Sequence, residues 1–181
     1  MRKFLLLLPV FVLIAASLGI IYSLNKNDND NENFNILTNE VMFKKITPNL
    51  MVADVNATVD YYKSNFDFQI LMGVDEGRGI KTGDPALEAP LTWAMIKKDD
   101  IEIMLQRADN FIEELPELNN LKIGGTFTLY VSMQNTKDFY EKIKNNVEIV
   151  KPIHKTFYGT DEFVVKDLNG YIIYFAEAQN G

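Results

Sequence analysis

The chain has 181 residues, of which 47% are apolar and 12% aromatic, and its formal charge is −7 at pH 7. This length suits one ordinary domain plus a short extra segment, and the apolar content excludes wholesale disorder. The sequence contains no cysteine and one histidine, His154, which excludes disulfides, thiolate sites and any metal site with two histidines from one chain.

The first predicted element is a hydrophobic helix at residues 1–24. Arg2 and Lys3 precede an uncharged run, residues 4–24, which at about 1.5 Å per residue is long enough to cross a hydrocarbon core of roughly 30 Å. The same pattern is typical of a cleaved secretory signal peptide, with residues 15–17 as the best cleavage site. Both of these interpretations predict export, to give a chain that is membrane-anchored outside the cytoplasm or secreted, and a buried core helix is the remaining alternative.

Residues 25–43 are predicted to form a flexible tether. Their first part, residues 25–40, is rich in asparagine and acidic residues and nearly free of apolar ones, so folding would bury too little surface to offset the lost entropy. Without the first 24 residues the chain carries 16 basic and 25 acidic side chains, a charge of −9. Such a domain repels phosphate groups, so we expect no nucleic-acid partner.

An internal repeat organises the chain from residue 44 to residue 179. The apolar triplet at residues 50–52 precedes one helix-like segment, and a second triplet, 79 residues later at 129–131, precedes another. A tandem repeat of one supersecondary unit explains this pattern, and chance similarity between two strand–helix pairs is the alternative. The repeat predicts two modules, at about residues 44–107 and 124–179.

The first module is predicted to contain four strands and one helix. Alternation of apolar and polar residues indicates the strands, and Asp54 is a suitable N-cap for the helix. A loop rich in glycine and proline, residues 73–90, interrupts the strands. In chain order, the predicted elements are strand 46–53, helix 56–65 and strands 68–72, 91–97 and 101–106.

The second module repeats this order after a short linking helix at residues 109–115. Asn169-Gly170 is a strong signal for a hairpin between its last two strands. The predicted elements are strand 126–132, helix 135–146 and strands 147–153, 162–166 and 171–177. Each half is therefore a βαβββ module, and the fold class is α+β, with the hydrophobic N-terminal helix ahead of the two modules.

Three stretches of the chain carry a resemblance to a known family. They are NLMVADVNATVDYY at residues 49–62, IEIMLQ at 101–106 and YGTDEFVVKDLNGYIIYFAE at 158–177. Together with the tandem βαβββ units, they resemble the glyoxalase/bleomycin-resistance/extradiol-dioxygenase superfamily, also called the vicinal oxygen chelate (VOC) superfamily. The resemblance covers residues 44–179 and implies a curled mixed sheet around one cleft, with helices packed outside.

In that fold, strand alternation sorts side chains between the core and the cleft. The residues expected to face the core are Leu50, Val52, Phe127, Leu129, Val131, Ile173 and Phe175. The residues expected to line the cleft and contact a ligand are Asn49, Met51, Trp93, Glu102, Gln106, Thr128, Tyr130 and Tyr174. For each of these eight the alternative is an ordinary sheet residue, and for Trp93 a core tryptophan.

The resemblance also implies where metal-dependent relatives carry their ligands. In this sequence the four positions fall on Thr47, Met104, Thr126 and Tyr174, with Glu102 or Gln106 as alternatives to Met104. A divalent ion needs three or four nitrogen or oxygen donors in a fixed geometry, which two threonines, a phenol and one carboxylate do not supply. We therefore expect no metal and no cofactor, and we interpret His154 as a solvated or edge residue.

The sequence thus predicts an extracytoplasmic domain that binds or sequesters a small molecule, as the resemblance to metal-free bleomycin-resistance proteins implies. The negative charge and Glu102 favour a cationic ligand, and Trp93 favours an aromatic one. The alternatives are a metal-dependent glyoxalase, isomerase or dioxygenase-like enzyme, or a partner-binding structural domain with a filled cleft. The ligand's identity and the choice between a monomer and a homodimer stay open.

Overall fold

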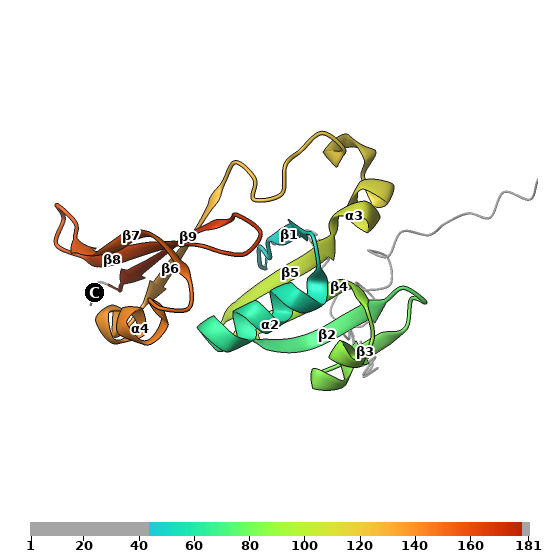
Figure 1. Ribbon diagram of the computed structural model, residues 1–181, viewed down its shortest axis with the longest axis horizontal. Coiled ribbons are helices and arrows are strands. Elements are labelled where there is room, and N and C mark those ends of the chain that lie inside the picture. Colours follow the sequence, from blue (N-terminus) through green and yellow to red (C-terminus); the bar gives the residue numbers. More distant parts are fainter. Residues whose placement is uncertain (1–43, 179–181) are drawn as a thin grey trace, which may run out of the picture. The chain divides into compact units, whose positions relative to one another are not determined.

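The computed structural model describes residues 44–178, drawn in colour in Figure 1. Residues 46–178 form one compact unit, which contains all the helices and strands of the described residues. The predicted hydrophobic helix at 1–24 and the tether at 25–43 lie outside the described residues. Among residues 44–178, no helix is long and apolar enough to cross a membrane.

The first module forms a five-stranded sheet with one long helix. Its elements are β1 (Asn49–Val52), α2 (Val55–Phe66), β2 (Gln69–Asp75), β3 (Ile80–Thr82), the 3-10 helix η1 (Asp84–Glu88), β4 (Leu91–Lys98) and β5 (Ile101–Arg107). The strand order is β1-β5-β4-β2-β3, with β1 parallel to β5 and the other pairs antiparallel. Both β3 and η1 lie in the region for which the sequence predicts only a loop.

The second module repeats this arrangement in a four-stranded sheet. Its elements are β6 (Thr128–Met133), α4 (Thr136–Ile143), β7 (Glu148–Lys155), β8 (Asp161–Lys166) and β9 (Ile172–Glu177), after a connection that contains α3 (Ala108–Glu114) and η2 (Pro116–Leu118). The order β6-β9-β8-β7 matches β1-β5-β4-β2, and β6 is parallel to β9. The predicted repeat and the α+β fold class are confirmed, with the strands in two sheets.

Helix α2 forms where its capping and apolar residues predict it. The Asp54 side chain accepts a hydrogen bond from the backbone N–H of Ala57 at 2.9 Å, which satisfies one of the free donors of the first turn. The helix ends at Asp67, which adopts a left-handed φ of 59°. Its apolar face buries Tyr62 and Phe66, so the helix packs onto both modules through one stripe of side chains.

The two modules share one hydrophobic core. The ring of Phe66 on α2 lies 5.4 Å from that of Phe175 on β9 and 6.4 Å from that of Phe139 on α4, measured between centroids. The residues predicted to face the core from β1 and β9 are buried, at 5% exposure or less: Leu50, Val52, Ile173 and Phe175. Burial of this apolar surface joins the halves into one folding unit.

A buried carboxylate links the modules as well. Asp167 accepts hydrogen bonds from the Tyr62 hydroxyl at 3.0 Å and from the backbone N–H groups of Asn169 and Tyr171 at 2.9 and 2.8 Å. The Tyr171 hydroxyl in turn donates to the backbone carbonyl of Met51 at 3.0 Å. Burial raises the pKa of Asp167 above its ordinary value, although the hydrogen bonds act in the opposite direction.

The first strand is shorter than predicted. Pro48 has no N–H to donate to a neighbouring strand, so β1 begins one residue later, at Asn49. The Pro48 carbonyl still accepts a hydrogen bond from the N–H of Met104 at 2.9 Å. Thr47 consequently precedes the strand instead of lying in it.

The strand that opens the second module also begins late. Gly124 and Gly125 adopt positive φ angles of 92° and 52°, so the backbone turns there and becomes extended only at Thr128. Thr126, predicted to lie in the strand, is an exposed bend residue. The prediction that Phe127 faces the core is wrong, because it precedes the strand and is 47% exposed.

Candidate functional site

The face of the five-stranded sheet opposite α2, hereafter the open face, collects most of the predicted site residues. Residues paired across neighbouring strands point to the same side of a sheet. One row across β1, β5 and β4 contains Met51, Gln106 and Trp93, since Gln106 pairs with both of the others. These three side chains are buried, at 5–8% exposure, although none of them belongs to the shared core.

A second row on the open face is made of thioethers. Met104 pairs with Met95, and Met95 pairs with Met72, so three methionines from β5, β4 and β2 lie side by side. Asn49 of β1 pairs with Met104 and ends the row. Thioether side chains are flexible and polarisable, so such a row adapts to apolar ligands of different shape.

The open face has a polar chain at its β1 edge. The side-chain amide nitrogen of Asn49 donates to Oε1 of Gln106 at 2.8 Å, and Nε2 of Gln106 donates to Oε2 of Glu114 on α3 at 2.9 Å. The oxygen of the same Asn49 amide, Oδ1, is buried and receives no hydrogen bond from the described residues. Glu102, at the opposite end of β5, lies 3.6 Å from the ammonium group of Lys97.

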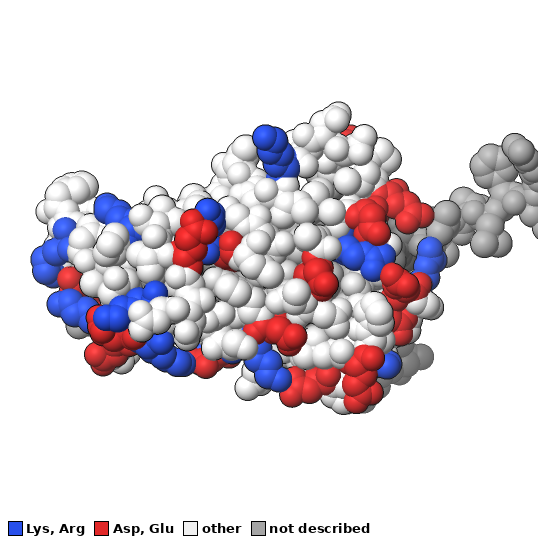
Figure 2. Space-filling view, viewed as in Figure 1, with Lys and Arg blue, Asp and Glu red and all other residues white. Residues whose placement is uncertain are grey.

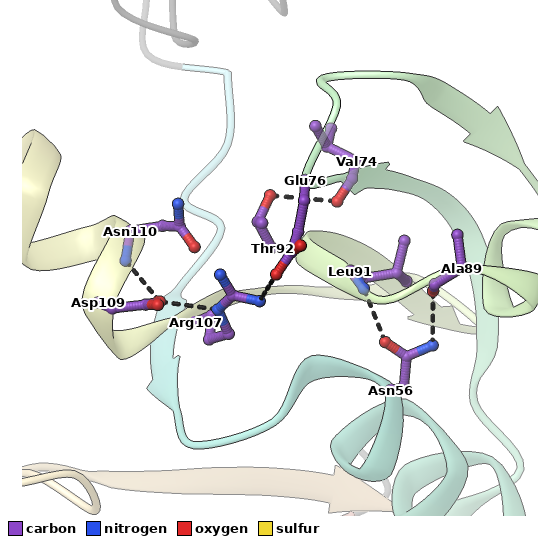
Figure 3. A network of polar contacts seen from close by, with 9 residues as sticks. All are labelled: Asn56, Val74, Glu76, Ala89, Leu91, Thr92, Arg107, Asp109 and Asn110. Carbon is purple, nitrogen blue, oxygen red and sulfur yellow. Dashed lines mark hydrogen bonds and ion pairs between the residues drawn. The ribbon is translucent and has the colours of Figure 1, made fainter.

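Arg107 fixes the start of α3 beside this face, as Figure 3 shows. Its guanidinium donates to Asp109 of α3 at 2.7 Å and to Glu76, next to the end of β2, at 2.8 Å. The hydrogen bond from Arg107 is the main reason that the pKa of Asp109 lies below its ordinary value. With the bond from Gln106 to Glu114, both ends of α3 are tied to the sheet.

A second set of contacts in Figure 3 fixes the chain that leads into β4. The Asn56 side chain on α2 donates to the carbonyl of Ala89 at 3.0 Å and accepts the N–H of Leu91 at 2.8 Å. Leu91 begins β4, the strand that carries Trp93 and Met95. The asparagine therefore helps to set the position of the open face from the opposite side of the sheet.

The remaining predicted contacts lie on the four-stranded sheet. Tyr130 of β6 pairs with Tyr174 of β9, and their rings stack with centroids 6.1 Å apart. Thr128 lies on the same face and is exposed. Partial burial, followed by the neighbouring Tyr158 and Glu162, raises the pKa of Tyr130. The structure therefore divides the predicted site residues between two sheets.

The four positions that the resemblance relates to metal ligands lie in separate segments of the structure. Thr47 precedes β1, and Thr126 lies in the exposed bend before β6. Met104 and Tyr174 belong to different sheets and contribute a thioether and a phenol. Within residues 44–178, no three His, Asp or Glu side chains are grouped to hold an ion. His154 lies in β7, with Nδ1 2.9 Å from the Pro152 carbonyl.

Sequence reasoning missed several residues of the open face. Met95 lies two residues after Trp93 in one predicted strand, so strand alternation places the two side chains on the same face. Met72 lies in a predicted strand that pairs with β4, but the pairing register is not visible in the sequence. Nothing in the sequence indicates that Glu114, in the helix between the modules, reaches back to the sheet.

A profile of the Glyoxalase/Bleomycin resistance protein/Dioxygenase superfamily matches residues 43–175. Because the match spans most of the chain, this protein belongs to that superfamily. A search of curated proteins finds no match.

Solved structures show the same fold. A protein of unknown function from Agrobacterium tumefaciens str. C58 is 16% identical, with 77% of this chain and 97% of that chain covered and a TM-score of 0.58. TioX from Micromonospora sp. ML1 is 18% identical, with 76% of this chain and 100% of that chain covered and a TM-score of 0.56. The bleomycin-binding protein from Streptomyces verticillus, solved with copper(II)-bleomycin, is 18% identical, with 77% of this chain and 99% of that chain covered and a TM-score of 0.50.

Proposed function

We propose that this chain is a small-molecule-binding domain that holds its ligand on the open face of the five-stranded sheet. The observation that carries the proposal is the pair of adjacent rows, one with Trp93, Gln106 and Met51 and the other with three methionines ending at Asn49. Apolar surface with a few placed polar groups is the usual composition of a ligand site. A bleomycin-binding protein among the structures of the same fold supports the proposal.

The composition of the face favours binding over metal-assisted chemistry. Thioether, indole and amide groups contact a ligand through dispersion and hydrogen bonds, whereas a Lewis-acid reaction needs a firmly held divalent ion. The residues at the family's metal positions do not provide one with suitable ligands. We therefore assign the site to binding or sequestering.

The charge distribution favours a ligand that is cationic or neutral. Residues 46–123 carry 7 basic and 14 acidic side chains, whereas residues 124–181 carry 6 and 7. In Figure 2, acidic side chains gather on the right, over the first module, and lysines are frequent on the left, over the second. A surplus of negative charge around the first module attracts cations and repels anions. Trp93 adds a flat surface on which an aromatic group stacks.

We expect ligands of this class to raise the thermal stability of the purified chain and to change the emission of Trp93, its one tryptophan. A screen of cationic and neutral aromatic compounds by thermal unfolding and fluorescence tests this. Met104→Glu places a charge in the middle of the open face and should abolish both responses. Ser132→Glu places the same charge on an exposed position of β6 in the other sheet and should preserve them.

Two outcomes of this screen count against the proposal. One is a library in which no compound stabilises the wild-type chain. The other is a set of stabilising compounds whose effect survives in Met104→Glu and disappears in Ser132→Glu, because that result would move the site to the four-stranded sheet.

We also propose that the domain acts outside the cytoplasm, held there or delivered there by residues 1–24. The support is the sequence itself, in which two basic residues precede an uncharged apolar run. Protease added to intact spheroplasts should degrade the domain of the wild-type chain and should spare that of a variant without residues 1–24. Protection of the wild-type domain until lysis would contradict export.

A further inference from the structure

We infer that the open-face site offers its ligand a hydrogen-bond acceptor and no donor at Asn49. The ligand therefore presents an N–H or O–H group to the side-chain oxygen of Asn49. The inference rests on the proposed function and deepens it by naming the chemistry that the ligand must have. Three side chains carry it: Glu114, Gln106 and Asn49, which are linked in a row by two hydrogen bonds.

The direction of this row is fixed at its Glu114 end. An ionised carboxylate only accepts hydrogen bonds, so the amide of Gln106 must turn its nitrogen toward Glu114, at 2.9 Å. That leaves Oε1 of Gln106 facing Asn49, at 2.8 Å, where only the nitrogen of the Asn49 amide makes a hydrogen bond. The side-chain oxygen of Asn49 is consequently the atom of these three side-chain amide and carboxylate groups that is left facing a ligand without a hydrogen bond from the described residues.

The remaining oxygen is buried on the ligand side of the sheet. Oδ1 of Asn49 accepts no hydrogen bond from the described residues, although a buried carbonyl oxygen without a donor is unfavourable. The row cannot reverse to present the nitrogen instead, because reversal would set the Gln106 oxygen against the Glu114 carboxylate. A ligand donor that displaces the cover over this oxygen and reaches it therefore gains affinity, and an acceptor does not.

The acceptor has a defined place next to the apolar surface. Asn49 pairs with Met104, which pairs with Met95, so the oxygen lies at one end of the methionine row. Gln106, in the adjacent row, has Trp93 as its neighbour on the other side. A flat apolar body covering the methionines and carrying a donor at its edge matches this arrangement, whereas a carboxylate or phosphate at that edge does not.

Matched compounds test the inference on the full-length chain. Indole and benzofuran share one shape, as do carbazole and dibenzofuran, and each pair differs in whether the ring carries an N–H or an oxygen. Dissociation constants are measured from the shifts of methionine methyl resonances on titration. We expect the N–H compound of each pair to bind about tenfold more tightly, the effect of one well-placed hydrogen bond.

Two variants separate this chemistry from simple packing. In Asn49→Leu the acceptor is replaced by an apolar group of similar size, so the preference for the N–H compound should vanish. In Glu114→Gln the row keeps its hydrogen bonds but is free to run in either direction, so the preference should fall several-fold while the fold, checked by circular dichroism, is unchanged. A purely structural role for Glu114 would leave the preference as it is.

The possible results separate the inference from the proposed function. If both compounds of each pair bind the wild-type chain equally, or if Glu114→Gln leaves the preference unchanged, the inference is overturned and the proposed function stands. If no compound shifts the methionine resonances up to its solubility limit, the proposed function fails and the inference fails with it.

Discussion

Replacement of Phe66 by alanine is expected to lower the free energy of unfolding by about 3–5 kcal/mol, the usual cost of removing a buried phenylalanine. Phe66 is 3% exposed and contacts rings of both modules, including those of Phe139 and Phe175. Urea denaturation followed by circular dichroism and by Trp93 fluorescence measures the change. Because the halves share one core, both signals should report one transition at the same urea concentration.

Phe157 provides the matched control for this prediction. It is fully exposed at the tip of the turn between β7 and β8, so Phe157→Ala removes the same ring and should change stability by about 0.5 kcal/mol or less. Equal losses in the two variants would contradict the assignment of Phe66 to the core. Separate transitions for the two signals would show that the modules unfold independently.

The second large effect is expected at Asp167. Removal of its carboxylate in Asp167→Ala leaves the buried hydroxyl of Tyr62 and two backbone N–H groups without their acceptor, which should cost roughly 2–4 kcal/mol. In Asp167→Asn one oxygen still accepts both N–H groups, and the amide nitrogen faces an oxygen of Tyr62 that can accept. The asparagine variant should therefore lie close to the wild type at neutral pH.

The comparison of Asp167→Asn with the wild type also predicts how the difference in stability changes with pH. Burial raises the pKa of Asp167 in the folded chain above the ordinary value of 3.8. A carboxyl group with a raised pKa contributes stability fully below its unfolded pKa, and this contribution is lost as the pH rises through the folded pKa. The asparagine variant has no such loss, so its stability relative to the wild type should increase from pH 3 to pH 7. A flat or falling difference in urea denaturation would contradict the raised pKa.

Local patterns in the sequence predict most elements of the fold, although they miss β3 and η1. The cap at Asp54 and the spacing of Tyr62 and Phe66 predict α2, because both signals act within a few residues of the helix. Strand alternation correctly separates Leu50, which is buried in the core, from Met51 on the open face. These predictions succeed since a strand's two faces follow from backbone geometry alone.

The prediction for Phe127 fails because it depends on contacts between distant segments. Gly124 lies so close to the turn before β9 that a Cβ atom there would be 2.9 Å from the carbonyl oxygen of Asn169. The positive φ of this glycine turns the chain, and the following residues do not extend until Thr128. No pattern near residue 124 reveals a partner 45 residues away.

In the candidate site, too, the sequence predicts features that depend on one strand and misses those that depend on contacts between distant segments. Alternation along one strand predicts that Glu102, Met104 and Gln106 share one side of the sheet, whereas the position of Trp93 beside Gln106 follows from strand pairing, which only the structure supplies. Tyr130 and Tyr174, which the sequence assigns to strands of the second module as further cleft residues, lie on the four-stranded sheet as expected. The contact of Glu114 with Gln106 depends on how α3 returns to the sheet, which strand patterns do not specify.

The most direct test of the account follows the methionine methyl groups of the chain by NMR while a compound from the thermal screen is added. Met51, Met72, Met95 and Met104 lie on the open face, whereas Met133 belongs to β6 of the other sheet. We predict that the resonances of the first four shift together and saturate, and that the resonance of Met133 stays in place. Saturating shifts at Met133 with the other four unchanged would contradict binding at the open face.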